Sequence, residues 1–409
     1  MTNSNFHILQ NKNAFNVFLS QLISTICDKM MSIGLVWYLT KEYSINVVPW
    51  FLMVSFLPHI FMSFYASGII NRLGVLKTVI RSEYIRGLIL LVLFGVLFLV
   101  PAKSTGFLVA LFISAFLVGV CSSLFNPAIL SLPPSLVESE KVPALNAILD
   151  TSFSVSNILG AACSIFLLNI FDIKTLVLIN ALSFFVAAIL QSRVSLLSTS
   201  QNAEGSEGTA NGPMQVLKKY PMIMRMLLSF LFINVVFTPI LVMIPWYVEN
   251  IFKGDASDLA LIEGAMGLGA FLTGMYLSVK SFAIREDRRI AMIAFICFLF
   301  GIFFQVFSFS TSTGEASFLL FLIGIISTFL NVQVLTYFQI SLKEEEVPAI
   351  MVAVNIISAA SMPLSFAISG ILFPRVDIPH FALMCGILTM LIAFCMPSFL
   401  KHQPQEGKV

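Results

Sequence analysis

The sequence predicts an all-α integral membrane protein with twelve transmembrane helices in two pseudo-symmetric six-helix bundles. Of its 409 residues, 58% are hydrophobic and 11% are charged, whereas soluble domains carry roughly 25% charged residues. Apolar runs long enough to cross a bilayer, about 20 residues each, recur along the whole chain. The chain also repeats itself, because 124–149 aligns without gaps with 329–354 at six identical positions, including a shared Val-Pro-Ala core. A weak repeat at about half the length is typical of duplicated membrane transporters.

The elements follow from these apolar runs. The twelve predicted crossings lie near 14–40, 46–70, 78–100, 105–131, 143–170, 173–193, 221–249, 256–279, 289–310, 315–340, 347–373 and 380–400. The widest polar interval is 194–219, which is rich in Ser, Gly, Asn and Glu and has no hydrophobic period, so it is predicted to be a flexible linker. We therefore expect one six-helix bundle over 1–193, a cytoplasmic linker over 194–219, and a second bundle over 220–409.

The distribution of Lys and Arg predicts the orientation. With the N-terminus inside, sixteen of the basic residues fall on cytoplasmic segments and five on outside loops. This positive-inside bias predicts that both termini are cytoplasmic, in a multi-pass protein of the inner (cytoplasmic) membrane. The polar N-terminus shows no cleavable signal pattern.

Several classes of function are excluded by what the sequence lacks. All six cysteines fall inside apolar segments without a CxxC pair, which indicates neither a disulfide framework nor a metal site. No nucleotide-binding loop or metalloprotease motif is present, so we expect no catalytic residues, no cofactor, no metal and no nucleotide. The net charge of +2 points to no nucleic-acid partner.

The segment GIINRLGVLK at 68–77 carries a resemblance. It resembles the Gly-x-x-x-Asp-Arg-x-Gly-Arg-Lys loop motif of the major facilitator superfamily, in which Gly68, Arg72, Gly74 and Lys77 match and Asn71 replaces the usual Asp. CDKM at 27–30, FNPA…PSLV…ALNA at 125–147 and the run at 225–248 are similar to the branch of macrolide-efflux proteins and enterobactin exporters.

The resemblance implies a fold of inverted three-helix repeats, with a substrate cavity between the halves near the membrane midplane. It also implies that 68–77 is a cytoplasmic gate latch. Gly68 and Gly74 would permit tight turns, while Arg72 and Lys77 would meet acidic groups or helix C-termini.

One segment departs from the family pattern. Many proton-driven exporters of the superfamily carry Gly-x-x-x-Gly-Pro-x-x-Gly-Gly in the fifth crossing, where this chain reads SVSNILGAACS at 154–164. Gly160 is kept and Ala161 stands where Pro is expected, while Ser156 and Ala162 are also small. Close helix packing is expected to survive, but the motif supports proton antiport less directly.

Asp28 is the first candidate for proton coupling or substrate binding. It falls near the middle of the first crossing, where a charged residue costs at least ~2.5–3.5 kcal/mol and therefore usually has a function. The carboxylate could take a proton or hold a cationic group of a substrate. The alternative is that it pairs with Lys29 or caps a local break, but adjacent residues point to different faces of a helix.

Three further candidates for this role carry open alternatives. Asp150 in the fifth crossing is either a coupling group or a residue solvated near the cytoplasm. Glu263 lies two turns in from the outer end of the eighth crossing, before a run of small residues, and is a candidate cavity residue. His59 is either a proton relay or a hydrogen-bonded packing residue.

The remaining candidates are polar residues of other crossings. Glu83 and Arg86 lie three residues apart on one face of the third crossing and are expected to form a structural or gating ion pair. The uncharged candidates could line a cavity or bridge helices, and they are Asn126, Asn331, Gln333 and Gln339.

These observations predict a monomeric secondary transporter that exports an amphipathic, drug-like or macrolide-like small molecule by proton antiport with alternating access. The alternatives are export of a siderophore-like secreted metabolite and translocation of a lipid.

Overall fold

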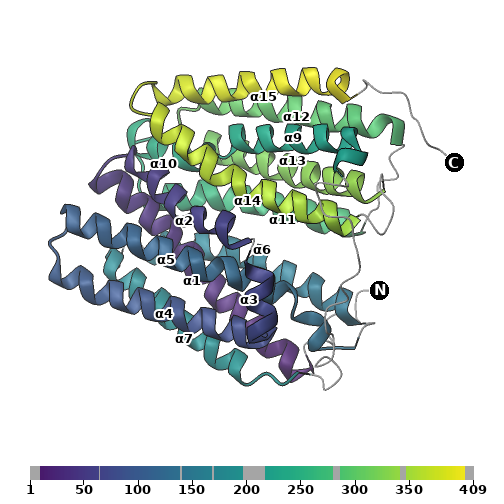
Figure 1. Ribbon diagram of the computed structural model, residues 1–409. Coiled ribbons are helices and arrows are strands. Elements are labelled where there is room, and N and C mark those ends of the chain that lie inside the picture. Colours follow the sequence, from purple (N-terminus) through teal and green to yellow (C-terminus); the bar gives the residue numbers. More distant parts are fainter. Residues whose placement is uncertain are drawn as a thin grey trace. The chain divides into compact units, whose positions relative to one another are not determined.

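The computed structural model describes residues 10–63, 65–138, 141–167, 170–196, 217–279, 286–340 and 347–400, and these form a succession of long helices (Figure 1). Contacts between the helices divide the chain into two compact units. The first unit comprises Met1–Ser206 together with Gly254–Gly264, and the second comprises Glu207–Lys253 together with Ala265–Val409.

The first unit contains the helices of the N-terminal half. They are α1 (Lys12–Glu42), α2 (Val47–Ser63), α3 (Ala66–Leu73), α4 (Val75–Leu99), α5 (Thr105–Leu130), α6 (Val142–Leu167) and α7 (Ile173–Ser192). Helix α1 packs against both α6 and α7, and α4 packs against α5 and α7. Residues of α1, α4 and α7 are thereby brought together within this unit.

The second unit contains the helices of the C-terminal half. They are α9 (Pro221–Phe237), α10 (Ile240–Asn250), α11 (Ala256–Val279), α12 (Glu286–Ser308), α13 (Thr313–Ile340), α14 (Val347–Leu372) and α15 (Ile378–Leu400). The division falls within α11, because its residues up to Gly264 cluster with the first unit. Helix α12 packs against α15 and α13, and α9 packs against α14 and α15.

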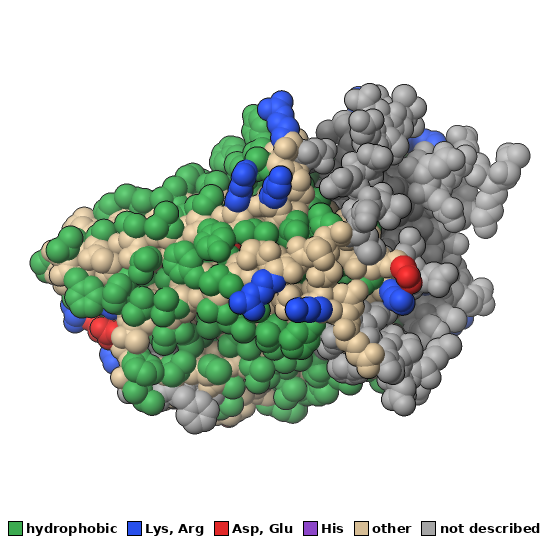
Figure 2. Space-filling view, turned by 90° about the horizontal axis from the view of Figure 1, so that it is seen from below, with side chains coloured by type: hydrophobic (Ala, Val, Ile, Leu, Met, Phe, Trp, Pro, Cys, Tyr) green, Lys and Arg blue, Asp and Glu red, His purple; other side chains and the backbone are tan. Residues whose placement is uncertain are grey.

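The helices have the length and composition of membrane spans. Within the described ranges, nine stretches of helix are long and apolar enough to cross a bilayer, and three shorter apolar helices accompany them. On the face shown in Figure 2, hydrophobic side chains cover most of the described surface, as expected for a surface in contact with lipid. The predicted fold class is confirmed by this helix content and by the structural comparisons below.

Two of the predicted crossings are interrupted. The crossing predicted over 46–70 is α2 followed by the short helix α3, so most of the segment predicted as a loop at 68–77 is helical. Hydropathy did not separate α2 from α3 because the residues on both sides of the break are apolar. The crossing predicted over 221–249 is divided into α9 and α10 at Thr238 and Pro239.

The break between α9 and α10 has a local cause. Proline has no backbone N–H, so Pro239 cannot donate the helical hydrogen bond to the carbonyl of Val235. The hydroxyl of Ser365 on α14 donates to that carbonyl instead, at 2.8 Å. A backbone acceptor that would be left unsatisfied in an apolar setting is thus satisfied by a neighbouring helix of the same unit.

The first unit contains a similar contact. The hydroxyl of Ser156 on α6 donates to the carbonyl oxygen of Leu22 on α1 at 3.3 Å. In each unit, therefore, a serine of the fifth helix in transmembrane order bonds to the backbone of the first. This correspondence is consistent with the duplication indicated by the sequence repeat.

Candidate functional site

The candidate site is built around Asp28, near the middle of α1. Its Oδ1 accepts a hydrogen bond of 2.9 Å from Nδ2 of Asn180 on α7. Its Oδ2 lies 3.8 Å from Nη1 of Arg86 on α4, and its side chain is 39% exposed. The carboxylate predicted from sequence is therefore held by two helices while one side of it stays accessible.

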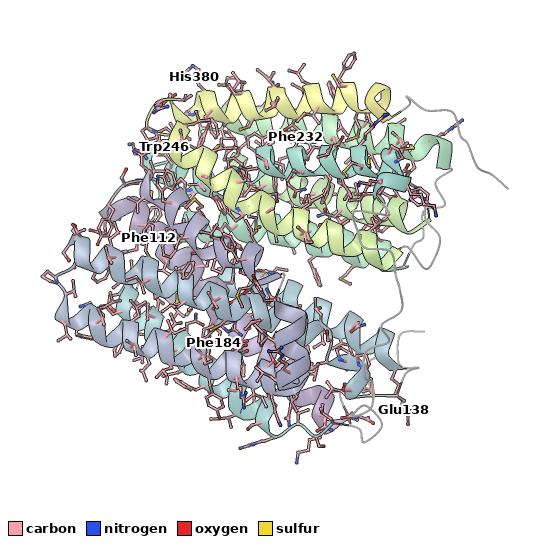
Figure 3. The ribbon with its side chains drawn as sticks, in the orientation of Figure 1. Phe112, Glu138, Phe184, Phe232, Trp246 and His380 are labelled. Carbon is pink, nitrogen blue, oxygen red and sulfur yellow. The ribbon has the colours of Figure 1, made fainter. Side chains whose placement is uncertain are left out.

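Arg86 is the cation of the site. Its side chain is only 5% exposed, and its Nη2 lies 2.7 Å from Oε2 of Glu83, whose side chain is fully buried. The guanidinium carbon lies 4.2 Å from the ring centre of Phe125 on α5 and 4.4 Å from that of Phe184 on α7. Such contacts stabilise a desolvated cation. Figure 3 labels Phe184 among the helices of the first unit.

Asn180 was not among the residues predicted from sequence. It is fully buried on α7, where the hydroxyl of Ser183 lies 2.8 Å from its backbone carbonyl oxygen and 3.1 Å from its Oδ1. With Oδ1 beside Ser183, the donor Nδ2 faces Asp28 and the sulfur of Met31. A single uncharged Asn within an apolar helix gives little signal, because such residues commonly bridge membrane helices for purely structural reasons.

Lys29 and Glu263 form an ion pair that sequence reasoning also missed. The ammonium group of Lys29 on α1 donates to Oε2 of Glu263, in the part of α11 that belongs to the first unit. Lys29 thus faces away from Asp28, as expected for adjacent residues of a helix. Glu263, predicted as a cavity residue, has a charged partner in this structure.

Gly160 lies where α6 meets α1 beside this ion pair. A Cβ atom added at Gly160 would lie 2.7 Å from Cβ of Lys29 and 2.8 Å from the carbonyl oxygen of Ile26. Gly160, within the segment 154–164 that corresponds to the family motif, therefore allows α6 to approach α1 closely, as its small residues predict. The next residue, Ala161, lies beside α11, with its Cβ 3.5 Å from a Cβ atom added at Gly264.

The remaining ionisable candidates are His59 and Asp150. His59 lies on α2 beside Pro58, with its ring centre 5.8 Å from that of Phe56. Its Nδ1 is buried and has no hydrogen-bond partner among the described residues. Asp150 lies on α6, and its side chain is outside the described part of the structure.

The uncharged candidates fall into different environments. Asn126 and Asn331, which are equivalent in the repeat, are exposed on α5 and α13. Gln333 is buried, and its Oε1 accepts a hydrogen bond of 3.0 Å from Nη1 of Arg289 on α12. It therefore bridges two helices of the second unit. Gln339 lies on α13, with its side chain outside the described part.

The segment predicted as a gate latch is a helix followed by a tight turn. Gly68, Asn71 and Arg72 belong to α3, and Gly74 joins α3 to α4 with φ of +83°, a conformation that favours glycine. Arg72 and Lys77 are exposed, and neither is ion-paired with another residue that the structure describes. The side chain of Asn71 is outside the described part.

Comparisons with solved structures show the same fold. The nucleoside transporter NupG matches with a TM-score of 0.75 at 11% identity, covering 95% of this chain and 99% of NupG. A D-xylose-proton symporter matches with a TM-score of 0.67 at 13% identity, covering 96% and 99%. At these identities the likeness concerns the fold alone.

Comparisons of sequence point to the same group of proteins. Macrolide efflux protein A of Streptococcus pyogenes is 22% identical over 398 residues, which cover 94% of this chain and 95% of the relative. The uncharacterized MFS-type transporter YvqJ of Bacillus subtilis is 23% identical over 256 residues, covering 60% and 59%.

The two helical units and the apolar spans describe a multi-pass membrane protein, and the family match that follows makes it a secondary transporter, not an enzyme. Residues 17–366 match the Major Facilitator Superfamily. The chain belongs to this family.

Proposed function

We propose that this transporter exports an amphipathic, cationic small molecule of macrolide-like character in exchange for protons. The observation that carries the proposal is the partly exposed carboxylate of Asp28, held near the middle of a membrane-spanning helix by Arg86 and Asn180. The similarity to a macrolide efflux protein over 94% of the chain supports the direction and the class of substrate.

Asp28 can perform the exchange because one carboxylate cannot bind a proton and a cationic group at the same time. When Asp28 is ionised, its exposed side attracts a positively charged substrate. When it is protonated, that attraction is lost and the substrate leaves. A substrate and a proton that compete for one group move in opposite directions through an alternating-access cycle.

We further propose that the protein acts as a monomer in the inner (cytoplasmic) membrane with both termini in the cytoplasm. The positive-inside bias of the sequence supports this orientation. Lys12 at the start of α1 and Arg193 at the end of α7 are exposed, and the side chain of Asn13 bonds to Ser195, so these two helix ends meet on the same side of the first unit.

The experiment is uptake of a radiolabelled macrolide into everted membrane vesicles at several imposed pH differences. Acid inside the everted vesicle should drive accumulation in the parent, and Asp28→Asn should abolish the dependence on the pH difference. Glu42→Gln is the matched control, since it removes an acid from the end of α1 that pairs with Lys103 away from the site.

If accumulation of the macrolide in the parent did not depend on the imposed pH difference, proton antiport would be ruled out. Accumulation of a polar anionic metabolite in place of the macrolide would favour the siderophore alternative. Unchanged pH dependence in Asp28→Asn would assign the coupling to another group.

A further inference from the structure

The site contains three charged groups, Asp28, Glu83 and Arg86, whose charges do not sum to zero. Asp28 and Glu83 each carry a negative charge when ionised, and Arg86 carries the positive charge that lies near both. The trio therefore has a net charge of −1, so one proton or one monovalent cation neutralises it. Which of the two acids receives it depends on which acid Arg86 neutralises.

Arg86 lies closer to the carboxylate of Glu83 than to that of Asp28. Arg86 lies 2.7 Å from Glu83 but 3.8 Å from Asp28. Glu83 is fully buried and lies on the same helix as Arg86, one turn away, so its pairing requires no other helix. Phe125 and Phe184, within 4.4 Å of the guanidinium carbon, pack against the guanidinium and stabilise it where it lies.

We propose that Glu83 is a positioning residue that holds Arg86 away from Asp28, so that Asp28 keeps an uncompensated charge for the proton or the substrate. This inference rests on the proposed function, in which Asp28 is the exchanging group. In this proposal Glu83 exchanges no proton in the cycle, because Arg86 at 2.7 Å stabilises its ionised form, and its burial keeps it out of contact with the substrate. Without Glu83, Arg86 would pair with Asp28 and close the site electrostatically.

None of the other described groups around Asp28 neutralises its charge. On α1, Cys27 precedes Asp28 and lies within its electrostatic range, and Lys29 is occupied by Glu263 of α11. From α5, Cys121 lies within range of Arg86. Helix α7 contributes the uncharged Asn180 and Ser183. Among the described groups, Arg86 is thus the cation that can neutralise Asp28.

The test measures the protonation of Asp28 directly. Infrared spectra of the purified protein in nanodiscs are recorded as a function of pH, and the carboxyl band that is lost in Asp28→Asn reports Asp28. In Glu83→Gln, Arg86 is free to pair with Asp28, so half-protonation should require a proton concentration about tenfold higher or more. The double variant Glu83→Gln/Arg86→Gln removes both charges, and its midpoint should return toward that of the parent.

A midpoint that is unchanged in Glu83→Gln, or that moves to higher pH, would overturn the proposal. If Glu83→Gln does not fold, the double variant still decides, because a midpoint far from that of the parent contradicts the proposal. The infrared measurement does not depend on transport. If the variants show the expected midpoints but the parent shows no proton-driven uptake, the proposed function is refuted. The proposal that Glu83 holds Arg86 away from Asp28 would then still stand.

Substrate affinity provides a second measurement. If Glu83 had only a structural role, removing Arg86 as well would not restore the affinity. Binding of the cationic dye ethidium should weaken about tenfold in Glu83→Gln and recover in the double variant. Equal weakening in both variants would indicate that Glu83 only supports the fold.

Discussion

Asn180 on α7 donates a hydrogen bond of 2.9 Å to the carboxylate of Asp28 on α1, although 152 residues separate them in the chain. The amide is fully buried and lies beside the hydroxyl of Ser183. Its donor stabilises the ionised carboxylate in the position where a cation can reach it. We therefore expect Asn180 to influence cation affinity as strongly as a residue that touches the substrate.

Asn180→Leu should weaken binding of a cationic substrate by about 1.5–3 kcal/mol, the value of a hydrogen bond to a charged group. Equilibrium binding to the purified protein measures this change. Ser183→Ala is the comparison, because it removes the hydroxyl that contacts Asn180 but leaves the hydrogen bond from Asn180 to Asp28 in place, so it should cost less. Equal affinities in Asn180→Leu and the parent would contradict the role.

Gly160→Ala should destabilise the first unit by about 1–3 kcal/mol, because the added methyl group would lie 2.7 Å from Cβ of Lys29 and force α6 away from α1. Thermal unfolding in detergent measures the loss. Gly95→Ala on α4 is the matched control, since a Cβ atom there meets nothing within 4 Å. A similar unfolding temperature for both variants would show that the close approach is unimportant.

Ser365→Ala should cost about 0.6–1.7 kcal/mol, the range measured for hydrogen bonds between membrane helices. The carbonyl of Val235 would lose its donor, because Pro239 cannot replace it. Ser369→Ala should have little effect, since its hydroxyl bonds only to a carbonyl of its own helix. The comparison uses thermal unfolding, and equal stability of the two variants would contradict the argument.

Lys29→Met should destabilise the protein by about 3–5 kcal/mol, because it leaves Glu263 buried without its cation. The double variant Lys29→Met/Glu263→Met should recover most of the lost stability. The pair of Lys103 and Glu42 supplies the comparison, since the side chain of Lys103 is 64% exposed and Lys103→Met is therefore expected to cost less than Lys29→Met. Chemical or thermal unfolding of these three variants and of Glu263→Met tests whether the losses in Lys29→Met and Glu263→Met are coupled.

Arg72→Ala should reduce transport while leaving the amount of protein in the membrane near that of the parent, because Arg72 is exposed at the end of α3. Arg81→Ala, an exposed cation on the neighbouring helix α4, should retain transport. Vesicle uptake normalised to protein abundance measures both. Parental transport in Arg72→Ala would remove this residue from the proposed gate.

Hydropathy was sufficient to predict where most of the helices lie, because a bilayer forces apolar runs of about 20 residues. It could not predict the break at Pro239, since a proline is tolerated within a membrane helix when another helix satisfies the freed carbonyl. Asp28, Glu83 and Arg86 were each predicted as candidates, because charge within a span is costly. Local sequence patterns do not encode helix packing, so they could not predict how these three residues meet. For the same reason they could not predict the bond from Asn180 to Asp28 or the pairing of Lys29 with Glu263.

The placement of Glu83 and Arg86 on one helix also affects how the protein is made. The two residues can neutralise each other as soon as α4 forms, so α4 can enter the bilayer as an ion-paired segment. Asp28 is synthesised earlier, yet its partner Asn180 emerges 152 residues later. During biosynthesis, α1 therefore carries a carboxylate that lacks its hydrogen-bond donor until α7 is inserted, so the early insertion of α1 bears the cost of a charge within the bilayer.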